Sequence, residues 1–146
     1  MMRTKILPGL MVAILLVAAT FSLCAQSGKE YFTVENYYKV KWGFADEFIS
    51  LWKKNHYPLL KKAIEKGDII SVEASTPKLH SGEDTRWDFR VVIVFANSQA
   101  AFDPNLTTPY KKQLYPDPDK LIKDEQHRFE LLLSHWDIMT DKVSLP

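Results

Sequence analysis

Apolar and polar residues alternate in four segments of the chain, and this period of two is typical of β-strands. The segments are residues 31–42, 69–75, 87–95 and 135–143. One side of the first segment receives Phe32, Val34, Asn36, Tyr38, Val40 and Trp42. The third segment is hydrophobic on both sides toward its end, which predicts a central strand.

Apolar residues recur at helical spacing between the first two strands, in a stripe that begins at Phe44 and reaches Ile64. Gly67 supplies the expected C-terminal stop of this helix. Pro58 removes a backbone donor inside it, so we expect a kink or a break into two helices at residues 55–58.

Two further helices are expected in the second half of the chain. A short one runs from Asn97 or Ser98 to Phe102, and a longer one from about residue 118 to Ser134. The apolar residues of the longer helix are spaced for one buried side: Leu121, Ile122, Phe129, Leu132 and Leu133. Residues 103–118 connect the two and contain four prolines. A connection of this length often forms a lid or a partner surface.

The predicted order is therefore β-α-β followed by β-α-β. This is the split βαβ, ferredoxin-like plan of the α+β class: βαββαβ, with a four-stranded antiparallel sheet and helices on one face. The domain is expected to span residues 31–146, after a short polar segment at residues 26–30.

The first 25 residues have the pattern of a cleaved signal peptide. Arg3 and Lys5 precede an almost wholly apolar stretch, which is too short to cross a bilayer comfortably. Cleavage is expected after Ala25, so we expect an exported protein, periplasmic or secreted, that meets the membrane only transiently through this segment. Cys24 leaves lipoprotein anchoring open as an alternative, but Leu23 before it fits that pathway poorly.

Cysteine content and charge narrow the chemistry. Cys24 is the only cysteine, so cleavage after Ala25 excludes disulfides and cysteine metal sites from the mature chain. The 19 basic and 18 acidic residues become 17 and 18 without Arg3 and Lys5, a net charge of −1. This balance gives no reason to expect a nucleic acid partner. No pair of histidines has metal-site spacing, and we expect neither a metal nor a cofactor.

The predicted strands and the first helix resemble the dimeric α+β barrel superfamily, which includes antibiotic-biosynthesis monooxygenase-like, EthD-like and NIPSNAP-like domains. The resemblance is carried by the strand from Phe32 to Trp42, by Trp52, His56 and Pro58 in the helix, and by the strand from Trp87 to Phe95 with Asn97 and Ser98 after it. It covers nearly the whole mature chain and is one of topology and placement. It implies a homodimer whose two sheets pair into a barrel, with activities that range from cofactor-independent oxygenation to haem degradation to no known catalysis.

The haem-degrading branch is similar in using an Asn on the first strand, a Trp on the third and a His soon afterwards. Asn36 and Trp87 match the first two positions. No His follows Trp87 before His127, and Asn97 stands about where one is sought. Haem binding or degradation is therefore an alternative that lacks one of its residues.

The more polar sides of the four strands carry the candidate site. If the apolar sides pack under the helices, the opposite sides bring together Tyr37, Arg90, His135 and Asp137. In a monomer they form a solvated sheet face. In a dimer they line a lumen where His135 with Asp137 or Glu35 acts as a proton shuttle and Arg90 holds a carboxylate or enolate. We expect residues 103–118 to close this pocket.

Three further residues are candidates. His56 acts as a base or ligand contact, or it caps a carbonyl that Pro58 leaves free. Asn36 binds a ligand or satisfies a backbone group. Trp87 is a ligand contact or part of the core. The sequence thus leaves two classes of function: a small-molecule-binding or cofactor-independent enzyme domain, and a non-catalytic interaction domain.

Overall fold

The structure is a computed structural model that describes residues 30–79, 81–143 and 145. Its strands are β1 (Phe32–Val40), β2 (Ile69–Ser75), β3 (Phe89–Phe95) and β4 (Leu132–Thr140). Its helices are α2 (Ala45–Leu51), η2 (Trp52–His56), α3 (Tyr57–Lys66), η3 (Glu83–Thr85), α4 (Ser98–Ala101), α5 (Thr108–Leu114) and α6 (Pro118–Glu130). The expected signal peptide, with Cys24, lies outside the described residues.

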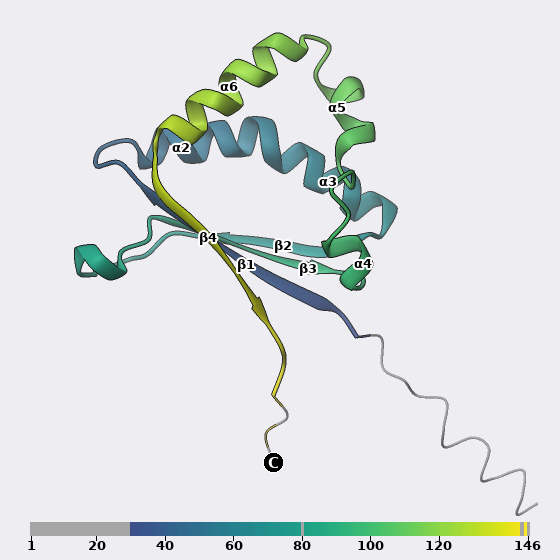
Figure 1. Cartoon of the computed structure of the whole chain (residues 1–146), viewed down its shortest axis with the longest axis horizontal. Coiled ribbons are helices and arrows are strands. Elements are labelled where there is room, and N and C mark those ends of the chain that lie inside the picture. The colour runs from purple at the N-terminus through teal and green to yellow at the C-terminus, as the bar shows by residue number, and fades with distance from the viewer. Residues whose placement is uncertain (1–29, 80, 144, 146) are drawn as a thin grey trace, which may run out of the picture. The chain divides into compact units, whose positions relative to one another are not determined.

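The four strands form one antiparallel sheet in the order β2-β3-β1-β4, and α2, α3 and α6 lie on one side of it (Figure 1). This is the ferredoxin-like arrangement, so the predicted fold class is confirmed for the described residues. β3 and β1 are central, and β3 alternates buried and half-buried residues because the helices cover only one side. We call the two sides of the sheet the helix side and the open side.

The core lies between the helix side of the sheet and the first helical run. Phe48 and Trp52 face the sheet, and the Phe48 ring packs against Tyr38 and Phe89, with ring centroids 5.1 Å and 6.2 Å away. These aromatic side chains bury large apolar areas and make edge or tilted contacts that favour one packing arrangement. The core therefore fixes the first helical run over β1 and β3.

The helical run from Ala45 to Lys66 is continuous, but it contains a wide π-helical turn at η2 just before Pro58. The local disruption expected at residues 55–58 is thus present as a wide turn rather than as a break. Gly67 ends the run with φ +87°, a left-handed conformation that favours glycine, as predicted.

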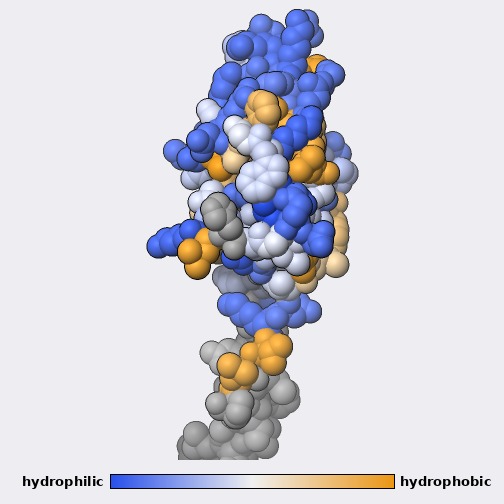
Figure 2. All heavy atoms as spheres, turned by 90° about the vertical axis from the view of Figure 1, so that its left-hand side faces the viewer, coloured by the Kyte–Doolittle hydropathy of each residue, from blue (hydrophilic) through white to orange (hydrophobic). Residues whose placement is uncertain are grey.

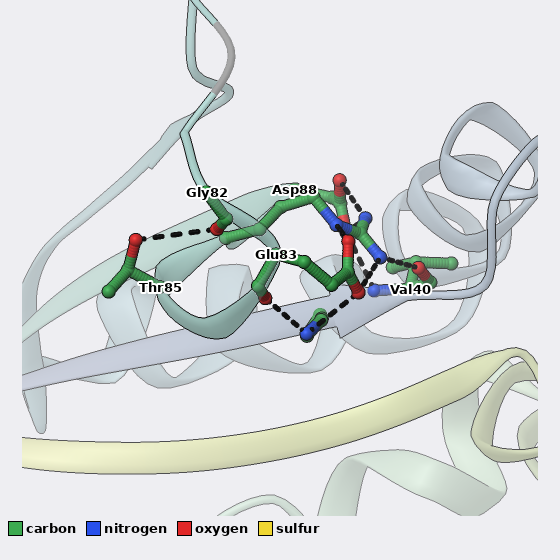
Figure 3. Close-up of polar contacts among 7 residues, drawn as sticks. Val40, Gly82, Glu83, Thr85 and Asp88 are labelled. Carbon is green, nitrogen blue, oxygen red and sulfur yellow. Dashed lines mark hydrogen bonds and ion pairs between the residues drawn. The ribbon is translucent and has the colours of Figure 1, made fainter.

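A polar network ties the β2–β3 connection to the end of β1 (Figure 3). The Arg86 side chain is only 6% exposed; it pairs with Asp88 and Glu83 and donates from Nη2 to the Val40 carbonyl at 3.1 Å. The Asp88 carboxylate in turn accepts from the Val40 backbone N–H at 2.7 Å. The guanidinium also lies 4.1 Å from the centre of the Trp42 ring. These contacts hold a long connection against the sheet end.

Three expectations about the second half of the chain are wrong in detail. The last strand begins at Leu132, three residues before the expected start, and the preceding helix ends at Glu130. The apolar residues of α6 are not a buried stripe, because Ile122 and Phe129 are 61% and 55% exposed. Residues 103–118 contain the helix α5, which we did not expect because the prolines of this connection indicated turns. Asn97 caps α4 by accepting from the Ala100 N–H, as predicted.

Figure 2 views the molecule from the end where the β1–α2 turn and η3 lie. Hydrophilic residues dominate the upper part of this view, and apolar residues appear as separate patches. Within the described residues, no helix combines the length and apolar character that a membrane span requires.

Candidate cavity between the helices

A cavity of about 740 Å³ lies between η2 and α3 on one side and α5 and α6 on the other. Its most buried lining residues are Asn55, Leu59 and Arg128, which form the floor. The exposed side chains of Ile122 and Phe129 stand at the rim. A mainly apolar hollow with a few polar groups is the usual form of a small-molecule site. The exposed apolar residues of α6 are therefore the wall of a cavity.

His56 lines this cavity from the last position of the wide turn. Burial lowers the pKa of His56 to about 4, and the nearby positive charges of Arg128 and Lys111 act in the same direction. The imidazole is therefore neutral near pH 7, with one nitrogen able to donate a hydrogen bond and the other able to accept one. π-helical turns occur frequently at functional sites.

Arg128 is a buried cation on the cavity floor, only 3% exposed. Its Nη2 and Nε donate to the Glu125 carboxylate at 2.8 Å and 3.3 Å. The guanidinium lies 4.6 Å from the centre of the Phe129 ring and 5.6 Å from that of Phe48. Its Nη1 makes no hydrogen bond to any described residue, so Arg128 has a donor left for a ligand.

Tyr115 fastens the end of α5 to the wide turn. Its hydroxyl lies 2.8 Å from the Asn55 carbonyl oxygen and 3.1 Å from the Lys54 carbonyl oxygen, so its single proton is shared between these two acceptors. The Lys54 carbonyl is the one that Pro58, which has no N–H, leaves without its helical donor. The cap that we expected from His56 is therefore made by Tyr115, and His56 faces the cavity.

The connection at residues 103–118 lines a cavity on the helix side of the sheet, and not the open-side pocket that we expected it to close. Thr107, Lys111, Tyr115 and Pro116 contribute to the lining. The polar cavity expected on the open side, with His135 and Asp137 beside Arg90, is not formed by the described residues.

His135 and Asp137 lie on the helix side, so their predicted placement is wrong. The register pairs His135 with Tyr38 and Asp137 with Asn36, whereas Arg90 pairs with Tyr37 on the open side. The His135 ring stacks on Tyr38, with centroids 4.4 Å apart, and its Nε2 lies 3.0 Å from an Asp137 oxygen. Polar residues are tolerated there because the edge strand β4 extends beyond the helices; Met139, on the same side, is 63% exposed.

On the open side, Arg90 and Tyr37 both hold the carboxylate of Glu35. Arg90 Nη2 donates to Glu35 Oε2 at 2.6 Å, and the Tyr37 hydroxyl donates to the same oxygen at 2.7 Å. Hydrogen bonds from Tyr37 and Arg90 lower the pKa of Glu35, and the same bond to Glu35 raises the pKa of Tyr37. The carboxylate that Arg90 was expected to bind is thus one of the chain's own.

Asn36 and Trp87 lie apart. Asn36 donates from Nδ2 to the Val91 carbonyl at 3.2 Å, which is the backbone role we considered for it. The Trp87 ring instead meets Tyr37 edge-on, with centroids 5.8 Å apart, and so contacts the open side. The two residues that suggested haem chemistry therefore do not converge. Ligand binding by either stays a prediction.

Sequence reasoning missed Arg128, Glu125 and Tyr115. The signal for Arg128 was present, because a cation stands beside Phe129 in the apolar stripe of a helix. A buried Arg in such a stripe needs a carboxylate, and Glu125 one turn earlier supplies it. Tyr115 had no comparable signal, because its partner carbonyls are 60 and 61 residues away.

No protein-family model matches the sequence, and no curated protein matches it significantly. Similar solved structures include a dimeric ferredoxin-like protein from an uncultured marine organism, with a TM-score of 0.49 and 8% identity over 79% of this chain and 89% of that one. A NIPSNAP family protein from Agrobacterium tumefaciens has a TM-score of 0.47 and 11% identity over 78% and 94%. A candidate antibiotic biosynthesis monooxygenase from Bacteroides thetaiotaomicron has a TM-score of 0.47 and 9% identity over 79% and 91%.

One of these neighbours is a dimeric ferredoxin-like protein, and the other two are of the NIPSNAP and antibiotic-biosynthesis-monooxygenase kinds. Their low identities and TM-scores transfer neither an activity nor an assembly to this chain.

Proposed function

We propose that the protein binds a small molecule in the cavity between η2–α3 and α5–α6. The observation that carries this proposal is the cavity itself: about 740 Å³, with a mainly apolar lining surface, His56 in its lining and the buried Arg128 at its floor. Such a combination of an apolar hollow, convergent polar groups and a strongly shifted pKa is the usual sign of a ligand or active site.

The neutral fluorescent probe N-phenyl-1-naphthylamine tests this proposal. We expect the purified protein to bind it, because its aromatic rings match the apolar walls. The double variant Leu121→Trp/Ile122→Trp places two large side chains in the α6 wall and should weaken binding at least about tenfold by occupying the cavity. Fluorescence titration measures both.

Leu133→Trp is the matched control, because it adds the same ring to an exposed position that does not line the cavity. It should bind the probe like the wild type. Equal affinity in the wild type and the double variant would show that the probe binds elsewhere and would refute the cavity as a binding site.

We also propose that the protein is a homodimer that pairs through the open side of the sheet. The stacked rings of Tyr37 and Trp136, with centroids 5.5 Å apart, lie there beside Ile138, which is 44% exposed, and the half-buried Val92 and Val94. Arg90 and Glu35 neutralise each other on the same surface. A second copy can therefore cover this part of the surface around a two-fold axis without stranding the charge of Arg90 or Glu35.

Ile138→Asp should halve the mass measured by light scattering, because it places a second carboxylate opposite Glu35 at the centre of the proposed interface. Met139→Asp is the matched control: the next residue of the same strand, on the other side of the sheet. It should leave the mass unchanged. A wild-type protein that is monomeric at high concentration would exclude the dimer.

The compartment of this activity is a proposal as well. We propose that the protein acts after export, on the sole support of the signal-peptide pattern at residues 1–25. The N-terminal sequence of the protein recovered from a periplasmic fraction tests it: a chain that still begins at Met1 would oppose it.

A further inference from the structure

The charges that line the cavity are unequal. Among the described lining residues, Lys111, Lys112 and Arg128 are cationic, and Glu125 is the single acid. His56 adds no positive charge near pH 7, because its pKa is lowered to about 4. The cavity therefore presents an excess of positive charge to anything inside it.

Arg128, the buried cation at the floor, is placed to contact a bound anion directly. Arg128 is 3% exposed, and Glu125 occupies only its Nε and Nη2. Its Nη1 has no hydrogen-bond partner among the described residues, so a ligand oxygen would meet a donor that water reaches poorly. A charge-assisted hydrogen bond to such a group is roughly twice as strong as a neutral one.

The rest of the cavity lining favours a ligand with an apolar body. Leu121, Ile122 and Phe129 supply the walls beside Leu59 of the floor, and Ile122 and Phe129 are more than half exposed. Burying these side chains under a ligand removes apolar surface from water, which favours binding. Because Arg128 is at the floor and these residues extend to the rim, the ionised group of the ligand would enter first.

We infer that the cavity selects anionic amphiphiles, molecules with one carboxylate, sulfonate or phosphate group on an apolar or aromatic body, and that Arg128 holds the anionic group while Lys111 and Lys112 add to the attraction at the mouth. This inference rests on the proposed small-molecule site and names its ligand class.

Two probes that share one skeleton test the selection. N-Phenyl-1-naphthylamine is neutral, and 8-anilino-1-naphthalenesulfonate is the same skeleton with a sulfonate. We expect the wild-type protein to bind the sulfonate about tenfold more tightly at low salt, since the charge-assisted contact is available to it alone. Equal affinities for the two probes would refute the selection even if the cavity binds both.

The variant Glu125→Gln/Arg128→Met removes the buried pair together, so that no charge is left stranded. It should lose most of the sulfonate preference, to threefold or less, while the affinity for the neutral probe stays within twofold of the wild type. Lys123→Gln, on the same helix and outside the cavity lining, should keep the full preference. A preference that survives in the double variant would refute the role of Arg128.

Two further measurements test the selection without changing the buried residues Glu125 and Arg128. Lys111→Gln/Lys112→Gln changes only exposed side chains and should lower the sulfonate preference about threefold. In the cavity-filling variant Leu121→Trp/Ile122→Trp the sulfonate probe should bind as weakly as the neutral one. If the sulfonate still binds there with wild-type affinity, surface charges and not the cavity hold it, and the inference is wrong while the neutral-probe result still decides the proposed site.

Discussion

Replacing Arg86 with Met is expected to lower the free energy of unfolding by about 3 kcal/mol, because it leaves the Asp88 carboxylate without its buried counter-charge. The same change removes the hydrogen bond to the Val40 carbonyl and the contact with the Trp42 ring. Figure 3 shows how the residues of this network come together at the end of β1. Urea denaturation followed by circular dichroism measures the loss.

Lys66→Met is the matched control. Lys66 also pairs with an aspartate, Asp68, at 3.0 Å, but its side chain is 65% exposed. An ion pair whose cation is this exposed to water contributes little, so this variant should change the free energy of unfolding by less than about 0.5 kcal/mol. If the two variants lose the same amount, the Arg86 network does not hold the connection against the sheet.

Acidification is expected to destabilise the protein through His56. Its pKa is about 4 in the folded chain and near 6.5 when the chain is unfolded, so the unfolded state binds the proton more readily. The stabilisation from neutral His56 is therefore complete above about pH 6.5 and is lost as the pH falls toward 4. A difference of this size corresponds to about 3 kcal/mol.

The test compares the free energy of unfolding at pH 7 and pH 4 in the wild type and in His56→Phe. The variant should lose about 3 kcal/mol less between the two pH values, because carboxylates that titrate in this range are common to both proteins. His127→Gln serves as the control with the opposite sign: a hydrogen bond to Glu47 raises the pKa of His127, so it stabilises the folded state at low pH. Equal losses in the wild type and His56→Phe would contradict the shifted pKa.

The sheet could be predicted from the sequence because its signals are local. The alternation in β1 and β3 and the glycine that ends α3 each depend on neighbouring residues, and the structure agrees with them. The side on which β4 presents His135 and Asp137 could not be predicted in the same way. Alternation separates a strand into two sets of residues. On an edge strand that the helices barely cover, either set can face the helix side, so the more apolar set does not identify that side.

The cavity required information that a single segment does not contain. Its walls come from two helical runs that are about 60 residues apart in the chain, and α5 forms within a connection whose prolines indicated turns. The exposed apolar side chains of α6 resembled a core stripe, because cavity walls and cores have the same composition. Only His56, singled out by its position before Pro58, was found from the sequence.

The wide turn at η2 also lets two parts of one helical run face different neighbours. A turn of this kind holds one residue more than an α-helical turn, so the residues after it point in directions that a regular helix would not give them. Phe48 before the turn and Trp52 at its start pack against the sheet, while His56 at its end is free to face the opposite helices. Deleting one residue from the turn would rotate the part of the run after it relative to the part before it. The chain could then keep either the packing of its core or the lining of its cavity, but not both.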